Sequence, residues 1–212
     1  MDTKTSESNG TIQYAQSAAH WEESPMAGPA VGTVADSVVQ GECRLPIPPP
    51  TSMTSADPLR QHLARLLVWE DAHAGFDSAV KDLPAALRGR VPDGLPYSPW
   101  QLVEHIRITQ DDILEFCRNP RYEEKKWPDD YWPRDAAPKA AKSWDESIAG
   151  FRRDRDGMVS LANDGGLDLF AKIPHGSGQT YLREILLVAD HTAHHVGELI
   201  VVRRLLGAWP PA

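Results

Sequence analysis

Residues 180–207 read TYLREILLVADHTAHHVGELIVVRRLLG, and this stretch decides the fold. Apolar residues recur through it at a spacing of three and four, which is typical of an α-helix and not of a strand. Gly207 suits the position just after the end of such a helix. Residues 190–199, inside this apolar run, nevertheless contain three histidines and two acids. The sequence therefore predicts a long, buried helix that carries a cluster of polar groups.

Two earlier helices are marked by their caps. Asp57 is an N-cap residue followed by proline, and apolar spacing then predicts a first helix over residues 58–80. Ser98 is followed by proline in the same way and opens a second helix, which ends where Asn119-Pro120 stops it at about residue 118. Each of these helices has an apolar face that needs a partner.

A third helix opens at Ser143 and has an apolar stripe that begins with Trp144. The connection before it, residues 119–142, has no periodicity and is long for a compact domain, so it either crosses the end of a bundle or covers a site. We expect its aromatic residues to be mainly packing anchors. No strand pattern competes. The predicted fold is all-α, a four-helix bundle over residues 56–209 with a long crossover between its second and third helices.

Residues 1–55 differ in kind from the bundle. They are rich in Ser, Thr, Gly and Pro, and they show neither helical nor strand period. Such a segment buries too little apolar area to offset its ordering entropy, so we expect a disordered extension. The first twenty residues lack the apolar run of a signal peptide, and Cys43 and Cys117 do not suggest a disulfide framework. These features favour a cytoplasmic protein.

The charge balance argues against some partners. A net charge of −8 and a pI near 5.4 disfavour a nucleic-acid binder, which would show a basic face. The basic run at residues 152–155 is interleaved with aspartate, as in a solvated helix face. No window contains the roughly 18 consecutive apolar residues of a membrane helix, so we expect no membrane association.

The three histidines of residues 190–199 point in different directions around the predicted helix. On an ideal helix His191 and His195 lie about 40° apart, and Glu198 lies about 20° from His191. His194 lies about 60° to the other side of His191. An i, i+4 pair of histidines is a common way for one helix to present two nitrogens to a metal ion.

A metal site needs at least one more ligand, and His105 on the buried second helix is the best candidate. Thr109 and Asp112 fall within about 40° of it on that helix, so polar groups accompany it. Three histidines would leave a coordination position open for water or substrate. The spacing also allows hydrogen-bonded structural histidines. Metal coordination explains the pattern more simply, because each buried imidazole without a partner would destabilise the fold by some kcal/mol of desolvation. The spacing does not name the metal.

The remaining chemistry-bearing residues give weaker signals. Glu70 and His73 form an E-x-x-H, half of a di-iron motif, but no second copy occurs and a di-iron centre is not expected. We expect His73 to line a pocket or to pack in the core. Cys117 is expected to be a small buried hydrophobe, and His175 to have a local structural role.

Several phrases of the sequence together resemble one family. SPWQLVEHI carries a histidine early in the second helix, ADHTAHHVGEL lies in the fourth, and LEFCRNPRY, WPDDYWP and IPHGSGQT lie between them. In order and spacing they resemble the DinB-like (YfiT-like) family of small metal-binding four-helix bundles, over residues 57–208. The resemblance implies that His105, His191 and His195 bind the metal, with His194 outside the ligand set.

The sequence departs from this family at two positions. Members of the same subgroup often carry tyrosine in place of His194 and glutamine in place of Glu198. Glu198 adds a negative charge near the metal, so it either orients a ligand histidine as a hydrogen-bond acceptor or competes as a fourth ligand.

The resemblance also implies a function. Relatives with known activities include transferases and isomerases that use low-molecular-weight thiols such as bacillithiol or mycothiol. We therefore expect a metal-dependent thiol S-transferase that acts on an electrophilic small molecule and forms a homodimer. The expected cofactor is a divalent cation, Zn or Ni before Fe or Mn; Glu198 would act beside it and His73 would line the pocket. A non-catalytic metal-binding stress-response module and a metal-dependent hydrolase remain open alternatives.

Overall fold

The computed structural model describes residues 57–211, and this part of the chain confirms the all-α prediction. An isolated bridge between Lys172 and Thr180 is its only β pairing. The predicted extension, residues 1–55, and Cys43 within it lie outside the described residues. The helices in chain order are α1 Pro58–Leu66, α2 Phe76–Val80, the 3₁₀ helix η1 Ala85–Leu87, α3 Pro99–Arg118, α4 Ala141–Asn163 and α5 Tyr181–Leu205.

The helix ends follow the local chemistry that the sequence predicts. The Asp57 side chain accepts a hydrogen bond from the backbone N–H of Leu59 at 3.0 Å. Ser98 and Gln101 form a reciprocal capping box at the start of α3. Gly207 follows α5 with a φ of 69°, the left-handed conformation that glycine adopts without a steric penalty.

The prediction of one continuous helix over residues 58–80 is wrong. Helix α1 ends at Leu66 and α2 begins only at Phe76, so residues 67–75 are not helical. A continuous helix would place Phe76 about 180° away from Leu67, so the two apolar stripes could not face one core. It would also turn the carboxylate of Glu70 toward that core, where burial without a partner is costly. The break lets both apolar stripes reach the interior.

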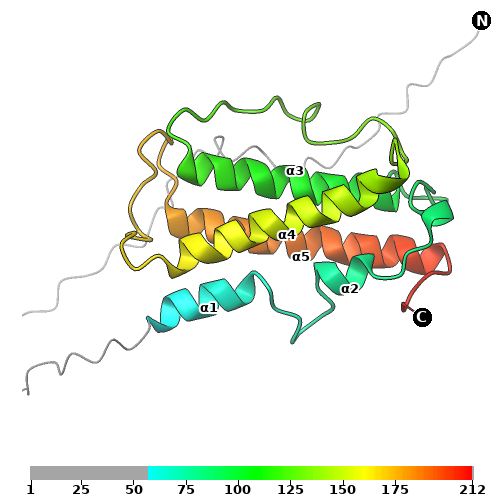
Figure 1. Ribbon diagram of the computed structural model, residues 1–212, viewed down its shortest axis with the longest axis horizontal. Helices are drawn as coiled ribbons and strands as arrows, with labels where there is room; N and C mark the ends of the chain where they lie inside the picture. The colour runs from blue at the N-terminus through cyan, green and yellow to red at the C-terminus, as the bar shows by residue number, and fades with distance from the viewer. Residues whose placement is uncertain (1–56, 212) are drawn as a thin grey trace, which may run out of the picture.

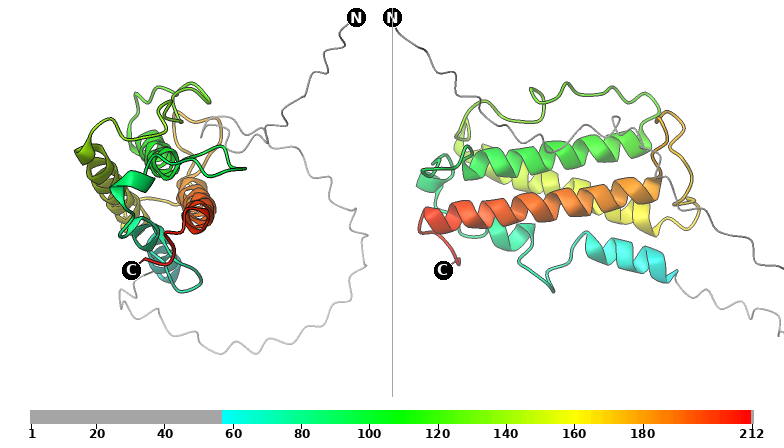
Figure 2. Two further views of the ribbon diagram at one scale, coloured as in Figure 1. Left: turned by 90° about the vertical axis from the view of Figure 1, so that its right-hand side faces the viewer. Right: turned by 180° about the vertical axis from the view of Figure 1, so that it is seen from behind.

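The long crossover, residues 119–140, determines the direction of the helices. It runs back along the bundle over α3, so that α3 and α4 are parallel (Figure 1). Seen end-on, α1 and α2 together occupy the fourth corner of the bundle, beside α4 and α5 (Figure 2). The predicted four-helix bundle with a long crossover is therefore present, with its first helix in two pieces.

The apolar core has two parts, one toward each end of the bundle. On α3, one part contains Leu102 and Ile106, and the other contains Ile113 and Phe116. On α5, Leu199 belongs to the first part and Ile185 to the second. Buried polar residues lie between the two parts on both helices: His105, Thr109, Gln110, Asp112, His191 and His195. A polar layer thus crosses the middle of the bundle.

Helix α5 also has the length and mean hydropathy of a membrane span, although it contains no run of about 18 consecutive apolar residues. It packs against each of the other four α-helices. A buried core helix has the same composition as a spanning helix, so α5 is weak evidence for a membrane span.

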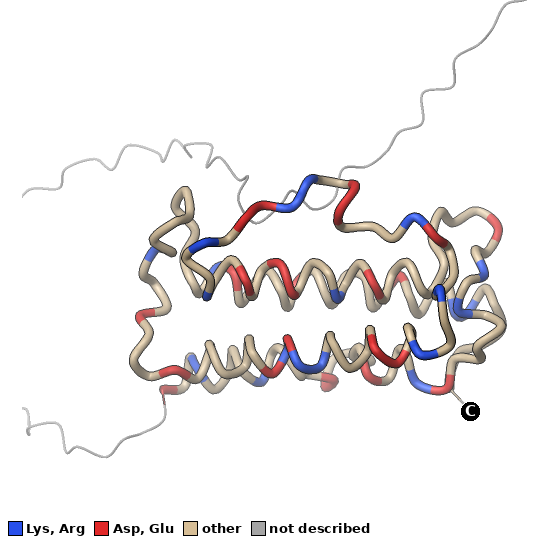
Figure 3. The backbone as a smooth tube through the Cα atoms, turned by 45° about the horizontal axis from the view of Figure 1, so that its top comes forward, with Lys and Arg blue, Asp and Glu red and all other residues tan. Residues whose placement is uncertain are grey.

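Charges of both signs are interspersed along the helices and the crossover (Figure 3). The basic run on α4, which the sequence predicts to be a solvated helix face, is paired with α2: Arg152 and Arg155 both donate to Asp77 at 2.7 Å. Burial raises the pKa of Asp77, but the hydrogen bonds from Arg155 and Arg152 and their charges lower it by more.

Arg203 joins α5 to the backbone at the end of α2 and to the segment that follows α5. It is fully buried on α5, and its guanidinium donates to the carbonyl oxygens of Ala79, Lys81 and Ala208 at 2.6, 2.9 and 2.9 Å. Arg203→Met should lower the free energy of unfolding by about 3 kcal/mol, because one buried and two partly buried carbonyls lose their donor. Arg204→Met, at the exposed neighbouring position, is the control. Equal urea midpoints for the two variants would contradict this role.

Candidate metal centre

The structure brings together the three histidines that the sequence singles out. His105 comes from α3, and His191 and His195 come from successive turns of α5. Their exposed fractions are 0%, 9% and 5%. The Nε2 atoms of His105 and His191 are 3.1 Å apart, and one ring nitrogen from each of the three lies within 4.8 Å of the others. The three rings therefore converge on one buried point.

The backbone of the crossover orients His105. The Nδ1–H of His105 donates to the carbonyl oxygen of Tyr131 at 3.0 Å, which leaves Nε2 with a free lone pair toward His191. Burial, together with the charge of nearby His195, lowers the pKa of His105 to about 3. Burial and the neighbouring histidines lower the pKa of His191 well below its ordinary value. Both rings are therefore neutral near pH 7, the form that binds metals.

Glu198 orients His195. The Nδ1–H of His195 donates to Oε2 of Glu198 at 2.6 Å, so Nε2 is the nitrogen left for a ligand bond. Burial raises the pKa of Glu198, but the hydrogen bond and charge of His195 lower it by more, which keeps the side chain ionised. Of the two roles that the sequence allows for Glu198, this geometry matches the orienting acceptor. His194 is half exposed, with Nε2 3.5 Å from Oε1 of Glu198, and lies outside the set of three.

Aromatic residues cover the histidines. Trp132 of the crossover stacks on His105 with ring centroids 3.7 Å apart and planes 9° apart. Tyr97, just before α3, stacks on Trp132 in turn at 4.2 Å. The crossover therefore covers the site, one of the two roles predicted for it. Its aromatics are packing anchors, as expected, but one of them packs directly on a histidine of the site.

Asp112 anchors the crossover to α3. Its buried carboxylate accepts hydrogen bonds from the hydroxyl of Tyr131 at 2.6 Å, the hydroxyl of Tyr122 at 3.1 Å and the ammonium of Lys125 at 2.9 Å. Burial and the hydrogen bond to Asp112 raise the pKa of Tyr131 far above its ordinary value, so the hydroxyl stays a donor. Asp112 therefore fixes Tyr131, whose carbonyl orients His105.

Comparison with known families agrees with this architecture. A family model described as the DinB superfamily matches residues 68–199, a segment that includes all three histidines. The chain belongs to the DinB superfamily. No curated protein and no solved structure matches the chain closely enough to be compared with it.

The donor set of this DinB-superfamily chain suits a divalent transition metal. It offers one imidazole nitrogen from each of three converging rings, two of them oriented by hydrogen bonds, and imidazole binds Zn, Ni, Cu and Fe alike. The nearest carboxylate, that of Glu198, already accepts the proton of His195. The three histidines therefore fit a metal centre with three protein ligands.

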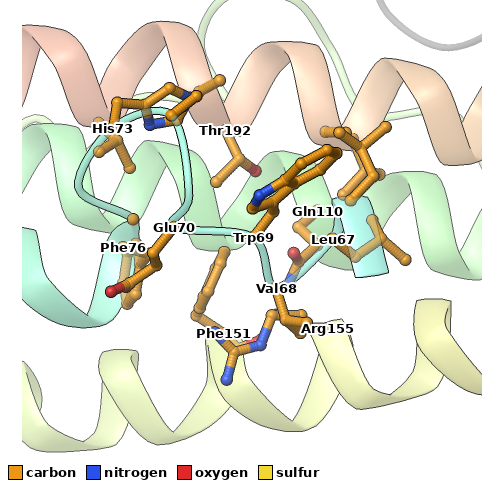
Figure 4. Close-up of a pocket in the computed structure, with 17 residues that line it drawn as sticks. Leu67, Val68, Trp69, Glu70, His73, Phe76, Gln110, Phe151, Arg155 and Thr192 are labelled. Atoms are coloured by element: carbon orange, nitrogen blue, oxygen red, sulfur yellow. Dashed lines mark hydrogen bonds between the residues drawn. The ribbon is translucent and has the colours of Figure 1, made fainter. Parts of the chain in front are cut away.

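His73, predicted to line the substrate pocket beside the metal, instead lines a pocket to which none of the three histidines contributes (Figure 4). Its Nδ1 lies 3.1 Å from the carbonyl oxygen of Ala74, and its predicted catalytic role stays a prediction. His175 has the predicted local role, with Nε2 2.8 Å from the carbonyl oxygen of Phe116. Cys117 is buried, and burial raises its pKa far above the ordinary value.

Sequence reasoning missed Tyr97, Tyr131 and Trp132 as parts of the site. Tyr131 acts on His105 through a backbone carbonyl, which carries no sequence signal. Trp132 lies in an aperiodic segment, and only its place in the phrase WPDDYWP set it apart.

The first prediction for the histidine site concerns metal content. Purified protein should contain about one divalent metal ion per chain, and His191→Ala should lose it because two protein ligands bind weakly. His194→Ala is the matched control, one helix position from a ligand, and should keep the metal. Elemental analysis of the three proteins decides the point. If wild-type protein remained free of metal after reconstitution with Zn²⁺ or Ni²⁺, the histidines would have a structural role and the metal centre would be excluded.

The second prediction concerns the Asp112 anchor. Tyr131→Phe removes the hydroxyl that fixes the Tyr131 carbonyl, so Zn²⁺ affinity should fall about 10- to 100-fold. Tyr122→Phe removes another hydroxyl from the same carboxylate but leaves the Tyr131 hydrogen bond in place. It should bind Zn²⁺ like the wild type in a competition titration with a chelator. Equal losses in the two variants would show that the anchor acts only through general stability.

Proposed function

We propose that this DinB-superfamily chain is a metal-dependent thiol S-transferase that joins a low-molecular-weight thiol to an electrophilic small molecule. The observation that carries the proposal is the convergence of three buried histidines, with the adjacent carboxylate already hydrogen-bonded to one of them. Such a donor set supplies three ligands and leaves a position open on the metal. Zn or Ni is the preferred cation, with Fe or Mn as alternatives.

The charge of the site supports an anionic co-substrate. Three neutral imidazoles do not neutralise a divalent cation, and Glu198 supplies a single negative charge beside them. A divalent cation bound there would lower the pKa of a thiol and so provide a thiolate near neutral pH. The sulfur would then bond to the electrophilic carbon of the second substrate as a leaving group departs.

The thiol would come from solution. Cys117 is the cysteine within the described residues, and it is buried with a raised pKa, so it is a poor nucleophile. It also takes no part in the histidine group. A small external thiol is therefore the simpler source of sulfur.

Residues around the three histidines would orient the ligand rings and cover the site. Tyr131 and Glu198 keep the rings of His105 and His195 in the orientation that directs Nε2 to the site. Trp132 covers one face of His105. Burial raises the pKa of half-buried Tyr97, and the charge of Glu198 raises it further, so its hydroxyl could donate to a substrate near the rim.

The test is thiol-dependent turnover. Metal-loaded wild-type protein should accelerate the loss of monobromobimane in the presence of bacillithiol, mycothiol or cysteine, followed by fluorescence. His105→Ala should lower the rate at least about 100-fold, because it removes a ligand of the catalytic metal. His194→Ala, which leaves the ligand set intact, should keep most of the rate.

The other outcomes separate the alternative functions. Equal rates for wild type and His105→Ala would exclude the proposed enzyme. Turnover of ester substrates without any thiol would identify a metal-dependent hydrolase. Stoichiometric metal without turnover of any thiol would favour a non-catalytic metal-binding module.

A further inference from the structure

A second site lies on another side of the polar layer. Residues 67–75, where the first helix is interrupted, cover a cavity of about 230 Å³ against α3, α4 and α5 (Figure 4). Phe76, Phe151, Val188 and Val196 form its apolar walls. The cavity exists because α1 and α2 leave a gap in the fourth corner of the bundle.

Gln110 of α3 is one of the residues with polar groups that line this cavity. Its side chain lines the cavity, and only 2% of the residue is exposed. The amide Nε2 donates to the carbonyl oxygen of Phe151 at 2.7 Å, which fixes the amide plane. The Oε1 atom accepts no hydrogen bond from any described residue. A free amide acceptor in the lining of a cavity favours a ligand that brings a donor.

The cavity is separate from the candidate metal centre. None of the three histidines lines it. On α3, Gln110 points about 140° away from His105, and on α5 Thr192 of the cavity lies about 100° from His191. A molecule in the cavity would therefore not contact the metal ligands.

The charges around the cavity cancel. Glu70 and Arg155 both line it, with opposite signs. Arg155 is paired with Asp77, and Glu70 accepts a hydrogen bond from Ser78 at 3.0 Å. Nε of Arg155 is buried without a hydrogen-bond partner, so the group keeps one donor, but the two charges are opposite in sign and the lining therefore favours a molecule without net charge.

We propose that this cavity binds a small, neutral, largely aromatic molecule that donates one hydrogen bond to Oε1 of Gln110. A cavity of about 150 Å³ lined by apolar side chains binds benzene, so this one has room for one substituted ring. Phenol is the simplest molecule of this class. Toluene has nearly the same shape but lacks the donor, which makes it the matched comparison.

The experiment measures the affinities of phenol and toluene for the full-length, metal-loaded protein by NMR titration of backbone amides. Both ligands should shift amides of residues 67–75 and of the facing turns of α5. The ratio of the two dissociation constants measures the contribution of the hydroxyl group to the affinity. In Gln110→Met, which keeps the size of the side chain but removes the acceptor, the preference for phenol should fall about three- to tenfold.

A second variant keeps the test decisive if Gln110→Met folds poorly. Ala189→Leu fills the cavity without touching the Gln110–Phe151 hydrogen bond, and it should weaken both ligands at least about tenfold. Metal content should be unchanged in both variants. An unchanged phenol preference in Gln110→Met, or no shift of cavity amides with either ligand because residues 1–56 fill the space, would overturn the proposal. So would loss of phenol binding in His105→Ala, which would place the phenol at the histidines.

Discussion

The burial of three imidazole rings in the middle of a helix bundle constrains the rest of this structure. A neutral imidazole has one nitrogen that donates and one that accepts, and both need partners where water is excluded. Tyr131 and Glu198 take up the donors of His105 and His195. The other nitrogens of these rings are directed toward a common point with His191. A cation bound at that point is the simplest way to satisfy all three rings together.

The two apolar clusters offset the cost of burying a layer of polar residues across the middle of the bundle. Because one cluster packs toward each end of the bundle, the helices are fixed on both sides of the polar residues. Because the apolar clusters occupy the two ends, the metal centre and the Gln110 cavity both lie in the polar layer at the middle of the bundle. The crossover covers the histidines on one side, and residues 67–75 cover the cavity on another. Stability thus comes from the ends of the bundle, while the middle carries the polar chemistry.

The sequence was sufficient where the signal is local or periodic. The caps at Asp57 and Ser98 and the i, i+4 spacing of His191 and His195 predict the helices and most of the histidine cluster. The break after α1 could also have been found, since Phe76 is out of phase with Leu67. What the sequence cannot show is contact through the backbone. The carbonyl of Tyr131 would be the same for any residue, and only the path of the crossover brings it to His105.

Glu198 sets the electrostatic character of the proposed centre. If its carboxylate bound the metal directly, a divalent cation would lose its open position. As an acceptor for His195, it makes that imidazole a stronger donor and still offsets one charge from outside the ligand set. The cation then keeps one net positive charge, which a single thiolate would neutralise. The hydrogen bond between His195 and Glu198 therefore supports both parts of the proposed function, the open position and the preference for an anionic sulfur.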